Sequence, residues 1–257
     1  ELAPLVLNDF DLSESVKDVL RHPTVASKSF LISIGDRSIT GMVVRDQYVG
    51  RYQVPVAACA ITASGLIALD GQAMTGEAMS IGERTPVALI DPKASARLAV
   101  GEAITNIAGA RIAQLSDITM SANWMAACGD DTEDAALFDA VHTVGEELCP
   151  ALGIAIPVGK DSLSMRANWS DEDADNQSQD KSVVSPMSLV ITAFAPVVDV
   201  AKTLTPELIN GDSAFYRLDL SRGKLRLGGS ILAQTASQLG NECPDLDKPS
   251  DLIDFFN

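Results

Sequence analysis

The stretch DPKASARLAVGEAITNIAG, residues 91–109, decides how this chain folds. Small and apolar residues fill it, and Asp91 and Pro92 match an N-cap and a first helical position, so it predicts a helix built to be buried. Glu102 and Asn106 lie four residues apart and therefore share one face of that helix. Such an oxygen pair suits Mg²⁺, which takes hard ligands and is completed by phosphate oxygens. The commoner alternative is an exposed Glu beside an Asn that prepares the helix end, and on spacing alone this alternative is favoured.

The rest of the chain alternates strand-like and helix-like segments, which predicts a mixed α/β or α+β fold. Residues 64–86 are expected to form a long loop with a short helix, and 170–182 a polar hairpin tip or surface loop. An amphipathic helix is predicted with Leu137, Val141, Val144 and Leu148 on one face. A short helix at 13–22 is expected to begin at Ser13. Apolar runs predict strands at 30–34, 40–44, 52–63, 86–91, 117–128, 154–158 and 186–200.

We divide the chain into an N-terminal connecting segment (1–29), a first subdomain (30–200) and the start of a second subdomain (201–257), which is expected to add a strand, a glycine turn and a helix. The second unit is too short to close by itself. The first residue is Glu1 rather than Met, and we expect that the chain has been cut from a longer protein.

Charge and cysteine content narrow the class of function. The net charge of −16 disfavours nucleic-acid and membrane-surface partners, whereas a small phosphorylated ligand stays compatible because a cation or helix end can reverse the sign locally. The four cysteines form no CxxC pair, which disfavours zinc and predicts reduced thiols in a cytoplasmic protein. No apolar run is long enough to span a membrane, and the first residues do not resemble a secretory signal.

Three further stretches carry two interpretations each. GKDSLSM (159–165) follows a predicted strand and is expected to form either a phosphate-cradling loop or an ordinary turn, although it lacks P-loop spacing. Asp36 and Arg37 are expected to pair within a tight turn rather than to face a ligand. GEAMSIGER (76–84) is expected to be a mobile surface loop or an active-site wall. No histidine has a neighbouring Ser or Cys that suggests nucleophilic catalysis.

Seven stretches occur in order along the chain: KSFLISIGDRSITGMVVRDQ, QVPVAACAITAS, GEAMSIGERTPVALID, ASARLAVGEAITNIA, SANWMAA, VGEELCPALGIAIPVGKDSLSM and SPMSLVITAFA. Together, from about Val19 to Val198, they resemble the central part of the large, single-chain bacterial phosphoribosylformylglycinamidine synthases. The resemblance implies an ATP-dependent ligase of purine biosynthesis, in which ATP activates the amide of formylglycinamide ribonucleotide and ammonia from glutamine replaces the phosphate. It also implies an aminoimidazole-ribonucleotide-synthetase-like fold that occurs twice in the enzyme. This chain resembles the second copy, without the first copy or the glutaminase.

The same resemblance implies a set of site residues. The family's second copy holds an auxiliary site for ADP and Mg²⁺. Glu102 and Asn106 match its metal ligands in GEAxxN, Lys28 matches a lysine expected near the nucleotide, and Ala57 matches an alanine whose backbone lies against it. No catalytic residue is assigned to this chain. The family's usual Asp, a further metal ligand, is replaced by Ala58, so the isolated chain is expected to bind ADP and Mg²⁺ poorly.

Three functions remain open at this stage. The chain is expected to form part of the ligase's active-site walls, or to be a degenerate copy whose nucleotide only stabilises the fold by binding to it. The absence of a complete acid–base or nucleophile set favours the second role for this part of the enzyme. A different member of the same superfamily, such as a selenophosphate synthetase, fits GEELCP and GKDSLSM badly.

Overall fold

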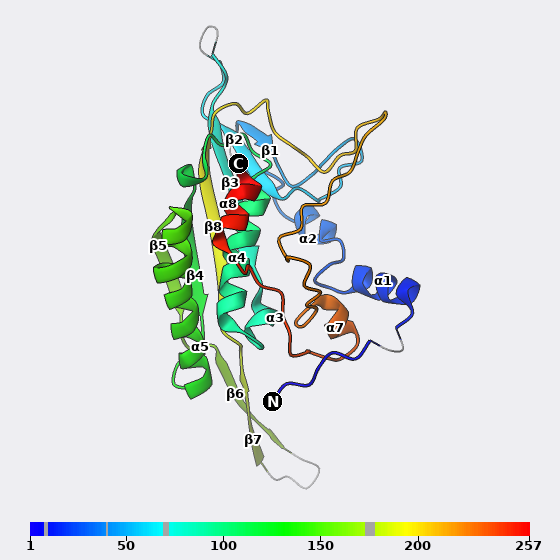
Figure 1. The fold of residues 1–257 in the computed structure, drawn as a ribbon, viewed down its shortest axis with the longest axis vertical. Coiled ribbons are helices and arrows are strands. Elements are labelled where there is room, and N and C mark those ends of the chain that lie inside the picture. Colours follow the sequence, from blue (N-terminus) through cyan, green and yellow to red (C-terminus); the bar gives the residue numbers. More distant parts are fainter. Residues whose placement is uncertain (8–9, 40, 69–71, 173–177) are drawn as a thin grey trace.

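The computed structural model describes residues 1–7, 10–39, 41–68, 72–172 and 178–257. Its centre is a six-stranded sheet in the order β1-β2-β3-β8-β4-β5, in which β4 and β5 are parallel and the other neighbours antiparallel (Figure 1). A separate hairpin, β6–β7, projects from one end of the molecule (Figure 1). The strands are β1 Val43–Arg45, β2 Cys59–Ala63, β3 Gly76–Glu83, β4 Thr119–Met125, β5 Ala155–Ser162, β6 Arg166–Glu172, β7 Ser178–Val184 and β8 Ser188–Val197.

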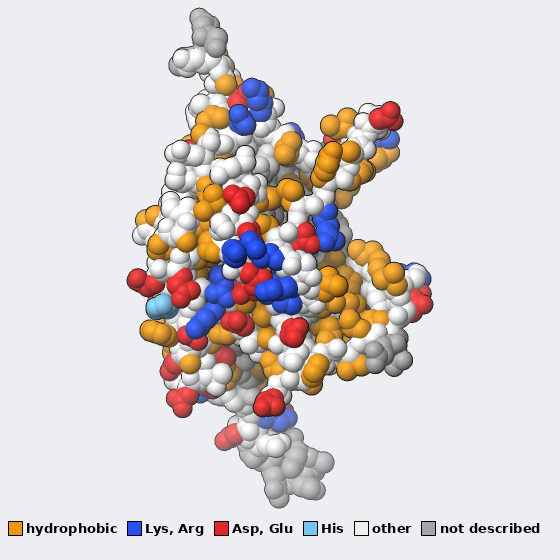
Figure 2. All heavy atoms as spheres, in the orientation of Figure 1, with side chains coloured by type: hydrophobic (Ala, Val, Ile, Leu, Met, Phe, Trp, Pro, Cys, Tyr) orange, Lys and Arg blue, Asp and Glu red, His pale blue; other side chains and the backbone are white. Residues whose placement is uncertain are grey.

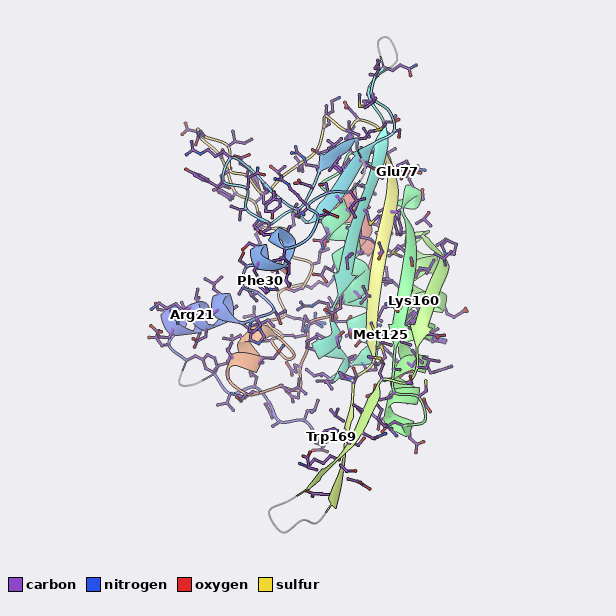
Figure 3. The ribbon with its side chains drawn as sticks, turned by 180° about the vertical axis from the view of Figure 1, so that it is seen from behind. Arg21, Phe30, Glu77, Met125, Lys160 and Trp169 are labelled. Atoms are coloured by element: carbon purple, nitrogen blue, oxygen red, sulfur yellow. The ribbon has the colours of Figure 1, made fainter. Side chains whose placement is uncertain are left out.

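Helices cover one face of this sheet. None of the described helices lies over the opposite face, which is turned toward the viewer in Figure 3. The helices are α1 Leu12–Arg21, α2 Ser29–Ser33, α3 Thr85–Ala88, α4 Pro92–Ile107, α5 Asp131–His142, α6 Cys149–Leu152, α7 Ile231–Thr235 and α8 Pro249–Phe256. In addition, a short 3₁₀ helix spans Leu115–Asp117 and a π-helical turn spans Thr143–Leu148. The mixed α/β fold class is therefore confirmed. None of the described helices is long and apolar enough to cross a membrane.

Helix α4 is the centre of the core, as its sequence predicts. The Asp91 carboxylate accepts hydrogen bonds from the amides of Lys93 (2.8 Å) and Ala94 (3.0 Å), which caps the helix, and Pro92 is the first helical residue. The inward side chains have no solvent exposure and pack on β3 and β8: Ala96, Ala99, Val100, Ala103, Ile104 and Ile107. Small residues on the helix let it lie close to the sheet.

Gly82 of β3 makes the closest approach between helix and sheet. A Cβ atom at this position would lie 2.1 Å from the carbonyl oxygen of Ala99 and 2.5 Å from the amide nitrogen of Ala103. Real Cβ atoms essentially never come so near to backbone atoms. The glycine in the middle of GEAMSIGE is therefore needed for packing.

Several predicted elements are wrong. Two of these predictions rest on short apolar runs. Residues 30–33 belong to helix α2, and 86–88 to helix α3, because a run of four or five apolar residues does not distinguish strand from helix. The predicted loop 64–86 contains β3, whose pairing with β2 and β8 outweighs its glycines. Residue 40 of the predicted strand 40–44 and residues 69–71 of that loop lie outside the described residues. The strands predicted within 52–63, 117–128 and 186–200 are confirmed as β2, β4 and β8.

The predicted loop at Gly159–Ser162 is also wrong, because these residues complete β5 and pair with β4 from Ala122 to Met125. Of the expected hairpin tip or surface loop at 170–182, residues 170–172 and 178–182 belong to the paired strands β6 and β7, and residues 173–177 lie outside the described residues.

The predicted amphipathic face of the 131–148 segment is only partly right. Val144 and Leu148 are buried and Leu137 packs against the core, but Val141 is 44% exposed. The π-helical turn Thr143–Leu148 follows α5 directly and adds a residue per turn, which shifts the phase of the buried side chains.

The C-terminal residues pack on this layer without a strand of their own. Residues 201–257 contribute α7 and α8, and the strand predicted there is not formed. Helix α8 contacts α4 and α6, and Leu252 of α8 is 1% exposed within the same core. Helix α1 is capped by Asp11, whose carboxylate accepts a hydrogen bond from the amide of Glu14 at 2.9 Å, so the cap lies two residues before the predicted Ser13. The division of the chain at residues 29 and 200 stays a prediction.

Candidate functional site

Two neighbouring hollows flank the polar face of α4. The larger one, the α4 cleft, has a volume of about 480 Å³ and is lined by Glu102, Asn106, Arg84 and parts of the segment 220–252. The smaller one, the Arg45 pocket, has a volume of about 240 Å³. It is lined by Arg45, Val49, Val56, Ala57, Ala58, Cys59, Thr105, Asn106, Gly109, Leu204, Thr205 and Pro206. Because Thr105 and Asn106 line both, the two hollows meet at the last turn of the helix.

Glu102 and Asn106 both bind the backbone of β3. Glu102 Oε2 accepts a hydrogen bond from the amide of Glu83 at 2.7 Å, and Asn106 Nδ2 donates to the carbonyl of Ile81 at 2.9 Å. Strand β2 pairs with β3 only as far as Ser80, so residues 81–83 pair with β8 on one side and have no described strand on the other. The two side chains therefore satisfy backbone groups that a neighbouring strand would otherwise bind.

The donor set at α4 is too small for a strongly bound divalent cation. Asn106 keeps Oδ1 available and Glu102 keeps one further oxygen, but Ala58 supplies a methyl group in place of a third ligand. The described residues contain no group of three or more His, Cys, Asp or Glu side chains placed to hold a metal ion. Since Mg²⁺ in proteins relies on carboxylates and phosphate oxygens, this site depends on the ligand for most of its oxygens.

Ion pairs neutralise most of the basic side of the α4 cleft. Lys224 Nζ lies 3.0 Å and Arg226 Nη1 3.1 Å from the two carboxylate oxygens of Asp247. Hydrogen bonds from these two side chains hold the pKa of Asp247 below its usual value. Arg97 pairs with Asp245 through two contacts, of 2.7 and 2.6 Å. Figure 2 shows basic and acidic side chains gathered over the centre of one face of the molecule.

The structure brings together three of the four predicted site residues. Ala57 lies in the Arg45 pocket with Asn106, and Glu102 lies in the adjoining α4 cleft. Lys28 precedes α2, its Nζ donates to the carbonyl of Ala26 at 2.5 Å, and it lines neither hollow. Their roles toward a nucleotide and a metal stay predictions.

The sequence alone indicated no role for Arg45, and it pointed to Arg84 only as part of GEAMSIGER. Arg45 is the last residue of β1 and precedes Asp46, and nothing in its sequence context marks it as a pocket residue. Residues 76–83 of GEAMSIGER form the paired strand β3 rather than a loop, and Arg84, which follows them, lines the α4 cleft. The expected Asp36–Arg37 pair is also wrong, because Arg37 Nε lies 2.6 Å from Asp46 Oδ2 and lowers the pKa of that carboxyl.

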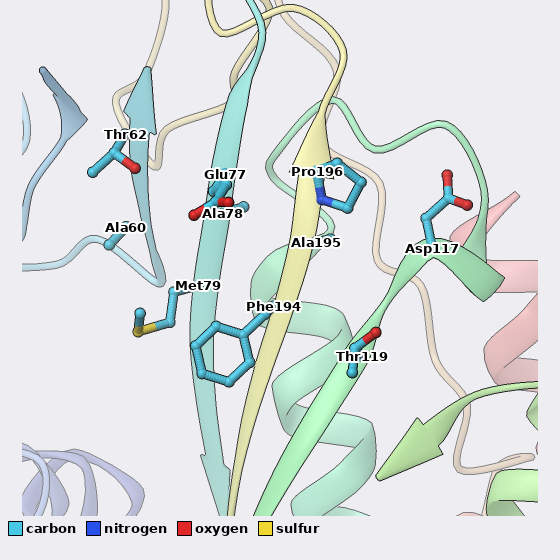
Figure 4. A pocket seen from close by; sticks show the side chains of 10 residues that line it. All are labelled: Ala60, Thr62, Glu77, Ala78, Met79, Asp117, Thr119, Phe194, Ala195 and Pro196. Carbon is cyan, nitrogen blue, oxygen red and sulfur yellow. The ribbon is translucent and has the colours of Figure 1, made fainter. Parts of the chain in front are cut away.

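A further hollow of about 340 Å³ lies on the uncovered face of the sheet (Figure 4). Strand alternation turns Glu77 and Met79 of β3 and Phe194 of β8 toward it, while Ala78 and Ala195 face the helices. Its lining is mainly apolar, with Glu77 on the central strand β3 and Asp117 at one side (Figure 4). Sequence analysis missed it because 76–83 was expected to be a loop.

Comparison with known proteins gives the family. Structures of Thermotoga maritima proteins resemble part of the chain: "Structure of PurLQS from Thermotoga maritima" is 19% identical with a TM-score of 0.47, and "T. maritima PurL complexed with ATP" is 17% identical with a TM-score of 0.44. Each covers 71% of this chain, which spans only 25% of either. Residues 27–196 match the domain family described as FGAR-AT PurM_N-like domain. That match extends over more than half of the sequence, and the chain belongs to this family.

Proposed function

We propose that this chain is the second synthetase copy of a phosphoribosylformylglycinamidine synthase of the large, single-chain type. The complete enzyme would convert formylglycinamide ribonucleotide to the amidine, with ATP and with ammonia from glutamine, in purine biosynthesis. The family match over 27–196 supports this proposal most directly. The remaining domains of the same polypeptide would be the chain's partners.

Within that enzyme, we propose an auxiliary nucleotide site at the polar end of α4. The observation that carries it is the meeting of Ala57, Asn106 and Glu102 around two joined hollows. Backbone atoms at Ala57 would lie along the nucleotide, and Lys28 would reach its phosphates after a rearrangement of the α2 start. A bound Mg²⁺ would have Glu102, Asn106 and phosphate oxygens as its ligands, so this site would hold it only weakly.

The role of this copy is proposed to be stabilisation rather than catalysis. Glu102 and Asn106 already hold the end of β3 through hydrogen bonds, so a ligand on them would tie the helix and the strand together. A ligand that binds only the folded state raises stability by mass action. Because Ala58 removes one carboxylate, the 257-residue chain alone would bind ADP with Mg²⁺ weakly.

The proposal is tested with Glu102→Ala in the complete polypeptide encoded by the gene. We expect the wild type to form the amidine with ATP and glutamine, and ADP to raise its melting temperature. The variant should keep turnover within about threefold and lose most of the ADP-dependent rise, since the bound nucleotide contributes stability alone.

Glu146→Ala, which removes the same charge from an exposed position on the 143–148 turn, serves as the control and should change neither property. Lost turnover with the ADP effect intact would favour a catalytic role for the site. A wild-type protein without amidine-forming activity would refute the enzyme assignment.

A further inference from the structure

The Arg45 pocket contains a positively charged side chain, although the chain as a whole is strongly acidic. Arg45 ends strand β1, and its Nε donates a hydrogen bond to Thr203 Oγ1 at 2.8 Å. This contact fixes the guanidinium by its inner nitrogen and leaves both terminal nitrogens for other acceptors. None of the ion pairs among the described residues includes it.

No acidic residue lines this pocket. Its walls are apolar side chains, the small residues Ala57, Ala58 and Gly109, and the polar groups of Thr205 and Asn106. The α4 cleft differs, because Glu102 and Asp245 line it and its Lys224 and Arg226 are paired with Asp247. In a chain of net charge −16, an acid-free pocket around an arginine is a local exception that attracts anions.

The dimensions and the remaining donors fit an oxyanion group. A volume of about 240 Å³ is below the range of about 300–1,000 Å³ that holds drug-sized ligands, but it accommodates a phosphoryl group. Gly109 can contribute only backbone atoms, and the space at its Cβ position opens toward Leu204 O at 3.7 Å and Cys59 Sγ at 3.9 Å. The Thr205 hydroxyl is a further donor in the wall.

We propose that the Arg45 pocket binds a phosphate oxyanion directly on the guanidinium, without a divalent cation. Arginine binds phosphate through parallel N–H donors and a permanent charge, which replaces the charge that a metal would bring. At α4, Glu102 and Asn106 offer few oxygen ligands to a metal and the Ala58 side chain offers none, which is consistent with this replacement. The inference rests on the proposed function only in taking the oxyanion to be that of a nucleotide.

The test is calorimetric titration of the 257-residue chain with pyrophosphate and with ADP, each in EDTA and in excess MgCl₂. We expect both ligands to bind in EDTA with a Kd within about threefold of that in MgCl₂. Arg45→Gln should weaken binding by about tenfold or more, because charged hydrogen bonds of this kind are lost. Arg21→Gln, which removes the same charge from the exposed end of α1, should leave the Kd unchanged.

If Arg45→Gln fails to fold, Gly109→Ala provides a second test, since its methyl group enters the pocket at ordinary contact distances and keeps every charge. It too should weaken pyrophosphate binding. Binding that requires Mg²⁺, binding unaffected by these variants, or no binding of either ligand would overturn the inference. Amidine formation by the complete enzyme is measured separately, so either proposal can fail without the other.

Discussion

At the scale of single residues, Glu102 and Asn106 serve the fold whether or not a ligand binds. Their hydrogen bonds to Glu83 and Ile81 close the edge of β3 where β2 stops. A site built on such residues is held in place by the scaffold, because each side chain is fixed by a backbone group. The same bonds mean that mutating them affects stability as well as binding.

We predict that Glu102→Ala lowers the free energy of unfolding of the chain by about 1 kcal/mol, because the Glu83 amide loses its acceptor. The loss stays near the lower end of the usual range since Glu102 is partly exposed and water can replace it. Glu102→Gln keeps an acceptor oxygen and should recover most of the loss in urea unfolding. Equal losses in both variants would contradict the hydrogen-bond explanation.

Gly82→Ala is predicted to destabilise the chain by about 2 kcal/mol or more, because its methyl group must push α4 away from β3. Gly101→Ala is the control within α4: nothing lies within 4 Å of its Cβ position, so it should stabilise by about 0.5–1 kcal/mol. Urea unfolding of both variants measures the difference. A neutral Gly82→Ala would show that the helix and the sheet are less closely packed than described.

At the scale of elements, an ion pair fastens the C-terminal segment to the α4 layer, and another holds the segment together internally. Arg97 of α4 binds Asp245 at 2.6 Å, with each side chain only 18% exposed, whereas Arg222 and its partner Asp251 of α8 both lie within the segment. Exposed pairs contribute little, but bidentate arginine contacts at low exposure contribute more. The Arg97–Asp245 contact and the buried Leu252 connect residues 220–256 to a core built mainly by residues before 200.

Acid is therefore predicted to loosen this segment first. Arg222 lowers the pKa of Asp251, and Lys224 and Arg226 lower that of Asp247. Stability from these carboxylates is complete above about pH 4, the value of the unfolded chain, and is lost as pH falls through the lower folded values. Hydrogen exchange below pH 4 should increase in 220–256 before it increases in α4. Asp251→Asn should show part of this increase at neutral pH, and simultaneous loss of protection in both regions would contradict the prediction.

Sequence patterns predicted the elements whose signals are long and local. Helix α4 has a cap, a first-turn proline and sixteen helical residues, and β8 is a ten-residue apolar strand. Strand β3 was missed because its glycines, read locally, signal a loop, whereas Gly82 is there to admit α4. The pairing of Arg37 with Asp46 and the Arg45 pocket depend on contacts between distant residues, which spacing along the chain does not encode.

At the scale of the whole molecule, the sheet carries a helical layer on one face and a partly apolar, uncovered face on the other. Met79, Ile81 and Phe194 of the uncovered face are 45%, 56% and 39% exposed. The core itself is built from small aliphatic side chains, as the low aromatic content of 5% requires. The four thiols can be used to probe this core, because two are buried, one is partly exposed and one is exposed.

Thiol titration is predicted to follow burial. Cys128 is exposed and should react first with a disulfide reagent at pH 8, while Cys149 and Cys243 react only as fast as the chain opens. Burial raises the pKa of both buried thiols to about 11. Because they ionise more readily when unfolded, stability should be complete below about pH 8.5 and should fall as pH rises toward 11. Uniform reactivity of all four thiols would contradict the described core.

The central claim is that the polar end of α4 forms part of a nucleotide site, and a crystal structure of the complete polypeptide with excess ADP and Mg²⁺ tests it most directly. We predict a nucleotide beside Ala57, with its phosphates near Asn106 and Arg45 and within reach of Glu102. The claim would be contradicted by an empty hollow in which Glu102 and Asn106 bind only the backbone of β3.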